Sequence, residues 1–141
     1  VWVEPERALF AGDIFGWGLI PLSADLKADA ARLLVGAYER LIQFDPAVVV
    51  PGHGPVCRRE ELRRWLDYFA WLQGEVAGAC AEGRQDGDIL RRIAPPEDMR
   101  RGLQSQWVAI GASTWWRFLQ WKHQDSLARV LHSVRRGWLK G

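Results

Sequence analysis

The sequence predicts an α/β fold built on a βαβ unit and followed by a helical extension. Two short apolar runs, Ala8 to Ala11 and Ala47 to Val50, each end in residues that break a strand. Between them, from about residue 24 to 44, apolar residues recur every three or four positions, which indicates a helix. A strand, a helix and a strand in this order form a βαβ unit, and its crossover makes the two strands parallel.

The first residues predict a hairpin. Val1 to Val3 and Ala8 to Ala11 are β-type runs on either side of the turn sequence Glu4-Pro5-Glu6-Arg7. Gly12-Asp13 closes the second run. The segment Ile14 to Ser23 mixes glycine and proline with apolar residues. We therefore expect a loop whose apolar side chains pack over another part of the protein.

Four stretches carry a helical pattern, and breaks separate them from one another and from a strand. The first helix is expected from about Ala24 to Phe44, with Ser23 or Asp25 as its N-cap and Asp45-Pro46 as its stop. Ala47 to Val50 is typical of a buried strand. Further on, the sequence predicts a helix from about Arg59 to Glu82, a linker at Gly83 to Gly87, a short helix at Asp88 to Ile93, a break at Ala94 to Glu97, and a last helix capped by Asp125. The domain boundaries expected from this pattern are 1–83 and 84–141.

Composition excludes some classes of function. A net charge of +2 is too small for a nucleic-acid-binding field, so we expect no nucleic-acid partner. No stretch approaches the roughly 18 apolar residues of a transmembrane helix, and Val-Trp-Val-Glu does not begin a signal peptide. We expect no membrane partner. The sequence does not decide whether the protein is located in the cytoplasm or in the periplasm. Nine Trp are unusual, and they suit core filling or a partner interface.

Asp13 and His53 are the candidate site. Each follows a predicted strand of the βαβ unit, and parallel strands bring their C-terminal ends to one edge of a sheet. A carboxylate and a neutral imidazole are common zinc ligands and also suit iron or manganese. Gly12, Gly52 and Gly54 would let the backbone approach the site closely or adopt positive φ. The competing interpretation is two ordinary turns, one Gly-Asp and one histidine in a Gly/Pro loop.

At these residues the sequence resembles the metallo-β-lactamase-fold hydrolase superfamily. The similarity lies in ALFAGD (8–13), the helix, DPAVVVPGHGPV (45–56) and the long helix after it, over about residues 1 to 82. The resemblance implies that residues 1–83 are the second half of an αβ/βα sandwich and residues 84–141 a helical C-terminal extension.

The resemblance also implies chemistry. Asp13 matches the carboxylate that bridges two divalent metal ions, zinc in the first instance, and His53 matches the last histidine, a ligand of the second metal. A metal-bound hydroxide would then hydrolyse a small-molecule ester, thioester or lactone. Phe15 and Trp17 would line the mouth of the substrate cleft.

The chain departs from the family in lacking the H-x-H-x-D-H motif and the middle histidine. Besides His53 it has only His123 and His132, which follow no ligand spacing. We therefore expect upstream sequence, a missing N-terminal half as partner, and an inactive isolated chain whose uncovered sheet could form a homodimer. Cys57 and Cys80 match no C-x-x-C motif, so free thiols and a bridge both stay open.

The tail WRFLQWKHQDSLARVL (116–131) is similar to the end of metallohydrolases associated with quinoprotein relay systems, which are generally periplasmic. Thioesterase-like, lactonase-like and sulfur-metabolism branches share the same Gly-Asp and PGHGP residues. A different class of function is a non-catalytic, Trp-rich helical module that dimerises or docks on a partner.

Overall fold

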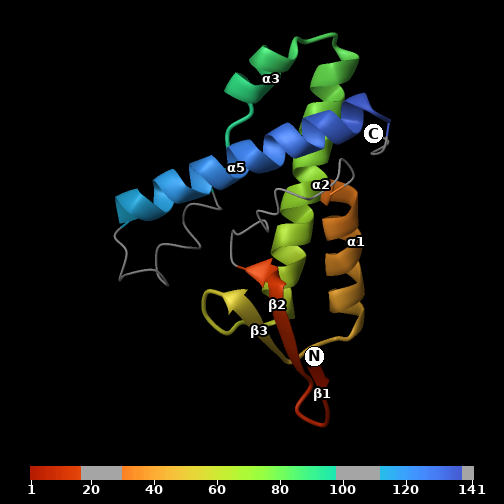
Figure 1. The fold of residues 1–141 in the computed structure, drawn as a ribbon, viewed down its shortest axis with the longest axis vertical. Helices are drawn as coiled ribbons and strands as arrows, with labels where there is room; N and C mark the ends of the chain where they lie inside the picture. The colour runs from red at the N-terminus through yellow and green to blue at the C-terminus, as the bar shows by residue number, and fades with distance from the viewer. Residues whose placement is uncertain (17–29, 98–111, 138–141) are drawn as a thin grey trace.

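The fold is α/β, with a small sheet at one end and long helices packed behind and beyond it (Figure 1). The computed structural model describes residues 1–16, 30–97 and 112–137. Their strands and helices are β1 (Trp2–Val3), β2 (Ala8–Gly16), α1 (Ala30–Gln43), β3 (Val48–His53), α2 (Arg59–Ala81), α3 (Asp86–Arg92) and α5 (Ala112–Arg135).

The sheet has the order β1-β2-β3 and contains the predicted βαβ unit. β1 pairs with β2 in the antiparallel sense across the Glu4–Arg7 turn, and β2 pairs with β3 in parallel, with Phe10 opposite Val50. The crossover from β2 to β3 includes α1, as a parallel connection requires. The C-terminal ends of β2 and β3 therefore lie at the same edge of the sheet.

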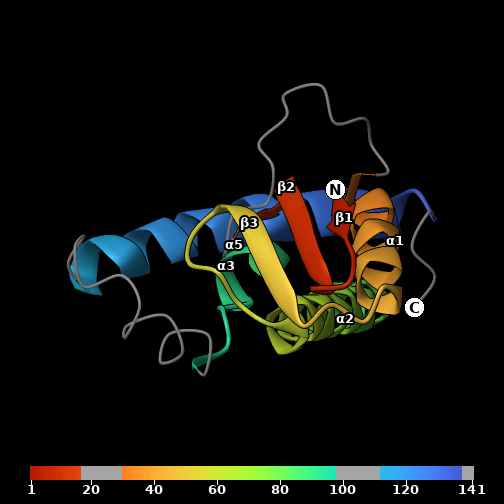
Figure 2. The same ribbon diagram turned by 90° about the horizontal axis from the view of Figure 1, so that it is seen from below.

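Only one face of the sheet is covered by the described helices. Along β2 the buried side chains of Leu9, Ala11 and Phe15 alternate with the exposed side chains of Phe10 and Ile14. This period of two places the first group toward α1 and α2, which Figure 2 shows on one side of the strands. The second group leaves an apolar surface on the opposite side.

The core begins as a chain of aromatic rings between the sheet and the helices. Phe15 of β2 meets Tyr38 of α1 edge to face at 5.7 Å between ring centroids, and Tyr38 meets Phe69 of α2 at 6.1 Å. Such contacts stabilise aromatic pairs beyond their buried area. Because Tyr38 is buried, its hydroxyl pKa is raised well above the usual value.

Helix α5 joins the same core. It crosses α2 (Figure 1), and four of its apolar side chains are buried in the cluster that also holds the sheet residues: Leu119, Leu127, Val130 and Leu131. Residues on both sides of the predicted 83/84 boundary thus share one hydrophobic cluster, and the boundary itself stays a prediction.

Several predicted bounds were wrong. β2 continues through Gly16, although the sequence predicted a strand that closes at Gly12-Asp13, and β3 runs to His53 instead of ending at Val50. Helix α5 begins at Ala112, so Asp125 lies in its middle and pairs with Arg129 at 3.0 Å instead of capping its start. The proposed caps at 23 and 25 lie outside the described residues.

The described tryptophans serve mostly as packing residues. Trp65 is buried, Trp71 and Trp116 are half-buried against the core, and Trp121 is half exposed. This agrees with core filling as the main role of the Trp excess. Cys57 and Cys80 are not joined in a disulfide.

Candidate functional site

Asp13 and His53 meet at the C-terminal edge of the sheet. Asp13 Oδ1 of β2 lies 3.3 Å from His53 Nε2 of β3. Their side chains are 77% and 60% exposed, respectively, so solvent and solutes reach both. The two residues are 40 positions apart, and the parallel pairing of β2 with β3 brings them together as the topology predicts.

Irregular pairing between the two strands sets this arrangement. The register shifts twice, between Phe10 and Gly12 and again between Gly12 and Gly16, where Gly16 stands opposite His53. Such bulges redirect side chains and are frequent next to functional sites. Gly12 has φ +55° at the first shift, a conformation that glycine adopts at little cost.

The loop that carries His53 is closed at its base. Val49 and Cys57 exchange two backbone hydrogen bonds of 2.9 Å, which join the strand before the loop to the residues after it. Gly54, with φ +101°, allows the chain to reverse inside this closure. Backbone contacts thus hold the chain on both sides of His53.

Gly52 lets the two strands approach closely. A Cβ at this position would lie 2.2 Å from Asp13 Oδ1 and 2.6 Å and 2.7 Å from the backbone C of Gly12 and N of Asp13. These distances are shorter than the contacts that Cβ atoms make in proteins, so no other residue fits at position 52 without moving β2. The predicted role of Gly52, a close backbone approach, agrees with this geometry.

The separation of the two donor atoms suits a single metal ion. Two ligands of a tetrahedral zinc with bonds of about 2.0 Å stand about 3.3 Å apart, which matches the distance between Asp13 Oδ1 and His53 Nε2. Over residues 1–16, 30–97 and 112–137, however, no group of three or more His, Cys, Asp or Glu side chains could hold a metal ion. The two donors fit a metal, and the described residues supply only part of a coordination shell.

Of the two predicted cleft residues, the structure describes only Phe15, and it does not reach the surface. Phe15 is fully buried in the core against Tyr38, because its position in β2 alternates with the exposed Ile14. The expectation that Phe15 borders the substrate was therefore wrong, and Trp17 lies outside the described residues. The error came from placing a loop where β2 continues.

His123 and His132 lie on α5, away from the sheet strands. His132 is exposed. His123 is buried, with Nδ1 at 2.8 Å from the Tyr68 hydroxyl and Nε2 at 2.8 Å from the Ile93 carbonyl oxygen. Because the carbonyl can only accept, Nε2 carries the proton and Tyr68 donates to Nδ1. Burial lowers the pKa of His123, so the ring is neutral at pH 7. No spacing of residues in the sequence predicts this contact between α2 and α5.

Comparison with protein-family models, with curated proteins and with solved structures found no match for the chain. Within its described part, no helix combines the length and the apolar character needed to span a bilayer.

Proposed function

We propose that the chain is the second half of a metal-dependent hydrolase of metallo-β-lactamase fold, with Asp13 and His53 as two of its metal ligands. The observation that carries the proposal is the 3.3 Å separation of Asp13 Oδ1 and His53 Nε2 at the C-terminal edge of parallel strands. The close approach at Gly52 supports it, because that contact holds the carboxylate against the loop of His53.

Each residue has a defined part in this proposal. Asp13 supplies an anionic oxygen and His53 a neutral ring nitrogen, and the closed loop between Val49 and Cys57 keeps the imidazole in place. The metal, when bound, would acidify a water molecule and polarise a carbonyl of an ester, thioester or lactone. Zinc is the first choice, and iron or manganese accept the same donors.

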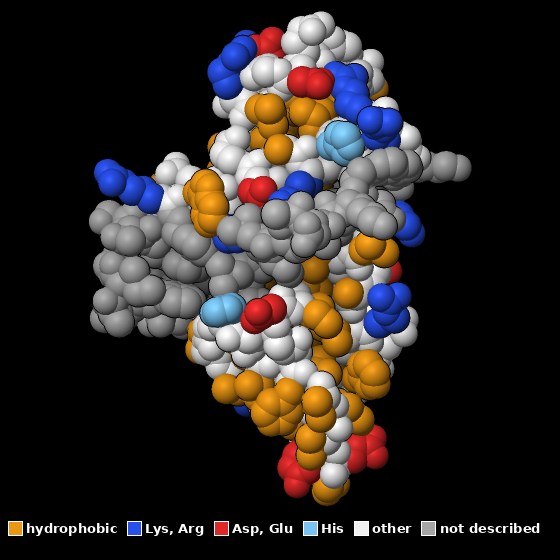
Figure 3. Space-filling model, in the orientation of Figure 1, with side chains coloured by type: hydrophobic (Ala, Val, Ile, Leu, Met, Phe, Trp, Pro, Cys, Tyr) orange, Lys and Arg blue, Asp and Glu red, His pale blue; other side chains and the backbone are white. Residues whose placement is uncertain are grey.

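The remaining ligands would come from an N-terminal half that covers the open side of the sheet. Phe10, Ile14 and Val48 are exposed there, and hydrophobic side chains gather over the strands in the space-filling view (Figure 3). A second sheet packed on this face would bury these side chains about 10 Å from its own backbone. The isolated chain would then bind metal weakly and catalyse nothing.

The test is a zinc titration of the chain, followed by NMR of the histidine side-chain nitrogens. We expect Zn²⁺ to shift the ring signals of His53 first, and we expect Asp13→Asn to weaken that response about tenfold or more, since it removes a ligand charge. His132→Asn, which changes an exposed histidine on α5, is the matched control and should leave the response unchanged.

In the longer protein that would contain the chain, His53→Ala should lower the bound metal per molecule and abolish turnover. Metal content and turnover that stay unchanged in this variant would reject the assignment of His53.

A second candidate is a non-catalytic module that dimerises through the open side of the sheet. The exposed Phe10, Ile14 and Val48, together with a ligand group that is incomplete among the described residues, favour it. Size-exclusion chromatography with light scattering tests this second candidate, because the module requires a stable dimer. A chain that stays monomeric at all concentrations contradicts it.

A further inference from the structure

Asp13 and His53 supply two donor atoms, which is half of a tetrahedral metal shell. Asp13 Oδ1 and His53 Nε2 lie 3.3 Å apart, as two ligands of one zinc ion do. More than half of each side chain is exposed, so another molecule can reach both atoms. Because a closed zinc site has four protein ligands, this one needs two further donors.

The histidines of the chain limit where these donors come from. The sequence holds three histidines. His123 is buried with both ring nitrogens in hydrogen bonds, and His132 lies on α5. Within residues 1–16, 30–97 and 112–137, neither ring joins Asp13 and His53 in a group that could hold a metal ion. A second imidazole at this metal therefore has to come from another molecule.

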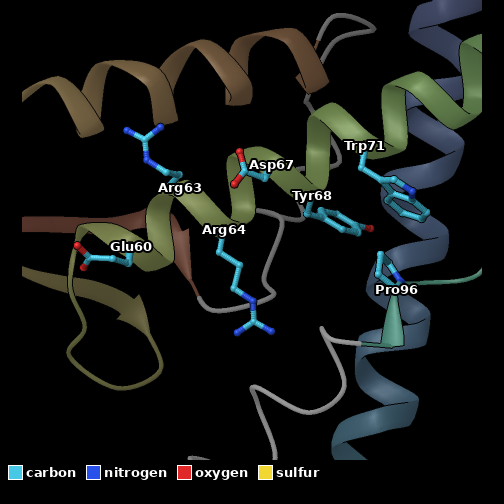
Figure 4. A pocket seen from close by; sticks show the side chains of 7 residues that line it. All are labelled: Glu60, Arg63, Arg64, Asp67, Tyr68, Trp71 and Pro96. Carbon is cyan, nitrogen blue, oxygen red and sulfur yellow. The ribbon is translucent and has the colours of Figure 1, made fainter.

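The acidic side chains of the cavity on α2 do not offer a comparable site. This cavity has a volume of about 470 Å³, and its lining includes the carboxylates of Glu60 and Asp67 (Figure 4). The same lining includes Arg63 and Arg64, the second of which also pairs with Glu61, and their positive charges oppose a cation. Its other described members are Tyr68, Trp71 and Pro96. The described lining thus combines carboxylates with guanidinium groups and has no imidazole.

A second copy of the chain would bring donors of the right kind and number to the edge of the sheet. In a dimer with two-fold symmetry the same surface meets itself, so two pairs of Asp13 and His53 can face one point on the axis. Together they supply two carboxylate oxygens and two imidazole nitrogens. The two carboxylate charges balance the charge of Zn²⁺. Without the ion they repel each other, so this contact depends on the metal.

The surface beside the pair also suits contact between two copies. Ile14 follows Asp13 directly in β2, and Ile14 and Phe10 are both about half exposed on the open side of the sheet. Hydrophobic side chains gather over the strands in the space-filling view (Figure 3). Burial of this surface stabilises association, and the exclusion of water strengthens the attraction between a metal ion and its carboxylates.

From these observations we infer that two copies of the chain share one zinc ion, which Asp13 and His53 of each copy hold on a two-fold axis. The inference rests on the proposed assignment of these residues as metal ligands and concerns the chain without an N-terminal half. The second copy then supplies the donors that an N-terminal half would supply in a longer protein. Since one copy offers only two donors, the metal and the partner bind together.

The experiment is size-exclusion chromatography with light scattering on the whole chain, at a concentration where the metal-free chain is monomeric. We expect Zn²⁺ to double the mass, and EDTA to restore the monomer. Isothermal titration calorimetry should show saturation at one zinc ion per two chains, because each chain supplies half of the four ligands.

Substitution of either ligand should weaken this dimer. Asp13→Asn and His53→Asn should each raise the zinc concentration for half-maximal dimerisation about tenfold or more, because each removes two of the four ligands from the shared site. The matched controls are Asp67→Asn, which removes an exposed carboxylate from the cavity on α2, and His132→Asn, which removes an exposed imidazole from α5. Both controls should dimerise as the wild type does, and thermal melting verifies that all four variants are folded.

The possible failures of this inference and of the ligand assignment can be told apart. One zinc ion per chain, with a mass that stays monomeric and ring signals of His53 that shift in NMR, overturns the shared site and leaves the two ligands in place. Zinc that leaves the His53 signals unchanged overturns both. A zinc-dependent dimer that persists unweakened in His53→Asn places the metal elsewhere and overturns the inference as well.

Discussion

At the scale of single residues, Gly52 is the tightest point of the candidate site. Gly52→Ala would place a Cβ against the Gly12 carbon at 2.6 Å and the Asp13 nitrogen at 2.7 Å. Since both are backbone atoms, β2 must move, and we expect a loss of about 1–3 kcal/mol in the free energy of unfolding. Urea denaturation at constant pH measures this loss.

The control for this prediction is Gly74→Ala in α2, where an added Cβ meets nothing within 4 Å. Because alanine favours a helix interior over glycine, this variant should gain roughly 0.5–1 kcal/mol. A Gly52→Ala protein as stable as the wild type would show that β2 and β3 do not approach as closely as described.

His123 makes stability depend on pH. Burial lowers its pKa in the folded protein, whereas the unfolded value is about 6.5. Below that pH the unfolded chain takes up a proton that the folded chain resists, so stability is full above about pH 6.5 and falls toward the folded pKa. We expect the urea midpoint to decrease between pH 7.5 and 5.5.

Replacement of the ring isolates this effect. His123→Phe should lose stability at every pH because Tyr68 and Ile93 lose their partner, and it should show a smaller decrease between the two pH values. His132→Asn, at an exposed position, should keep the wild-type decrease. An undiminished pH dependence in His123→Phe would contradict the assignment.

At the scale of helices and strands, the sequence is most informative where one pattern is strong. The apolar stripe with Leu62, Phe69 and Val76 predicted α2 to within one residue at its C-terminus, and the parallel pairing of β2 and β3 followed from the order of elements. The extent of β2 could not be predicted, because its glycines and Asp13 are typical of turns and are kept in the strand by pairing with β3. The start of α5 was also missed: the helix begins at Ala112, before Asp125.

Helix α5 is expected to unfold together with the rest of the molecule. Leu127 is fully buried in the cluster shared with α2 and the sheet, so Leu127→Ala should cost about 2–5 kcal/mol and keep a single transition. Circular dichroism and Trp fluorescence should give the same midpoint. Gln124→Ala, exposed on the same helix, should change stability by less than about 0.5 kcal/mol. Two separate transitions would instead show an independent extension.

At the scale of the whole molecule, the candidate site could be predicted only in part. Topology placed Asp13 and His53 at one edge, whereas their 3.3 Å separation also depends on the two register shifts between β2 and β3. The burial of Phe15 and the contact between Tyr68 and His123 depend on side-chain directions and on long-range packing, which spacing in the sequence does not encode.

The open side of the sheet should govern association of the isolated chain. Phe10 and Ile14 are each 48% exposed, and the double variant Phe10→Lys, Ile14→Lys should reduce both binding of an apolar dye and the mass at high concentration in light scattering. Leu33→Lys on α1, at 49% exposure, is the control and should behave as the wild type. Equal effects of both changes would show that hydrophobic exposure in general, and not this face, drives association.

The bridge between Val49 and Cys57 has a consequence for how copies of the chain can aggregate. It occupies backbone donors and acceptors at the outer edge of β3. A strand from another copy must therefore break two hydrogen bonds before it can pair with β3 at this position. This bridge therefore opposes fibril growth by strand addition at this edge. Association through the open side of the sheet is the easier route. Amide hydrogens of Val49 and Cys57 should consequently stay slow to exchange with deuterium even inside assemblies.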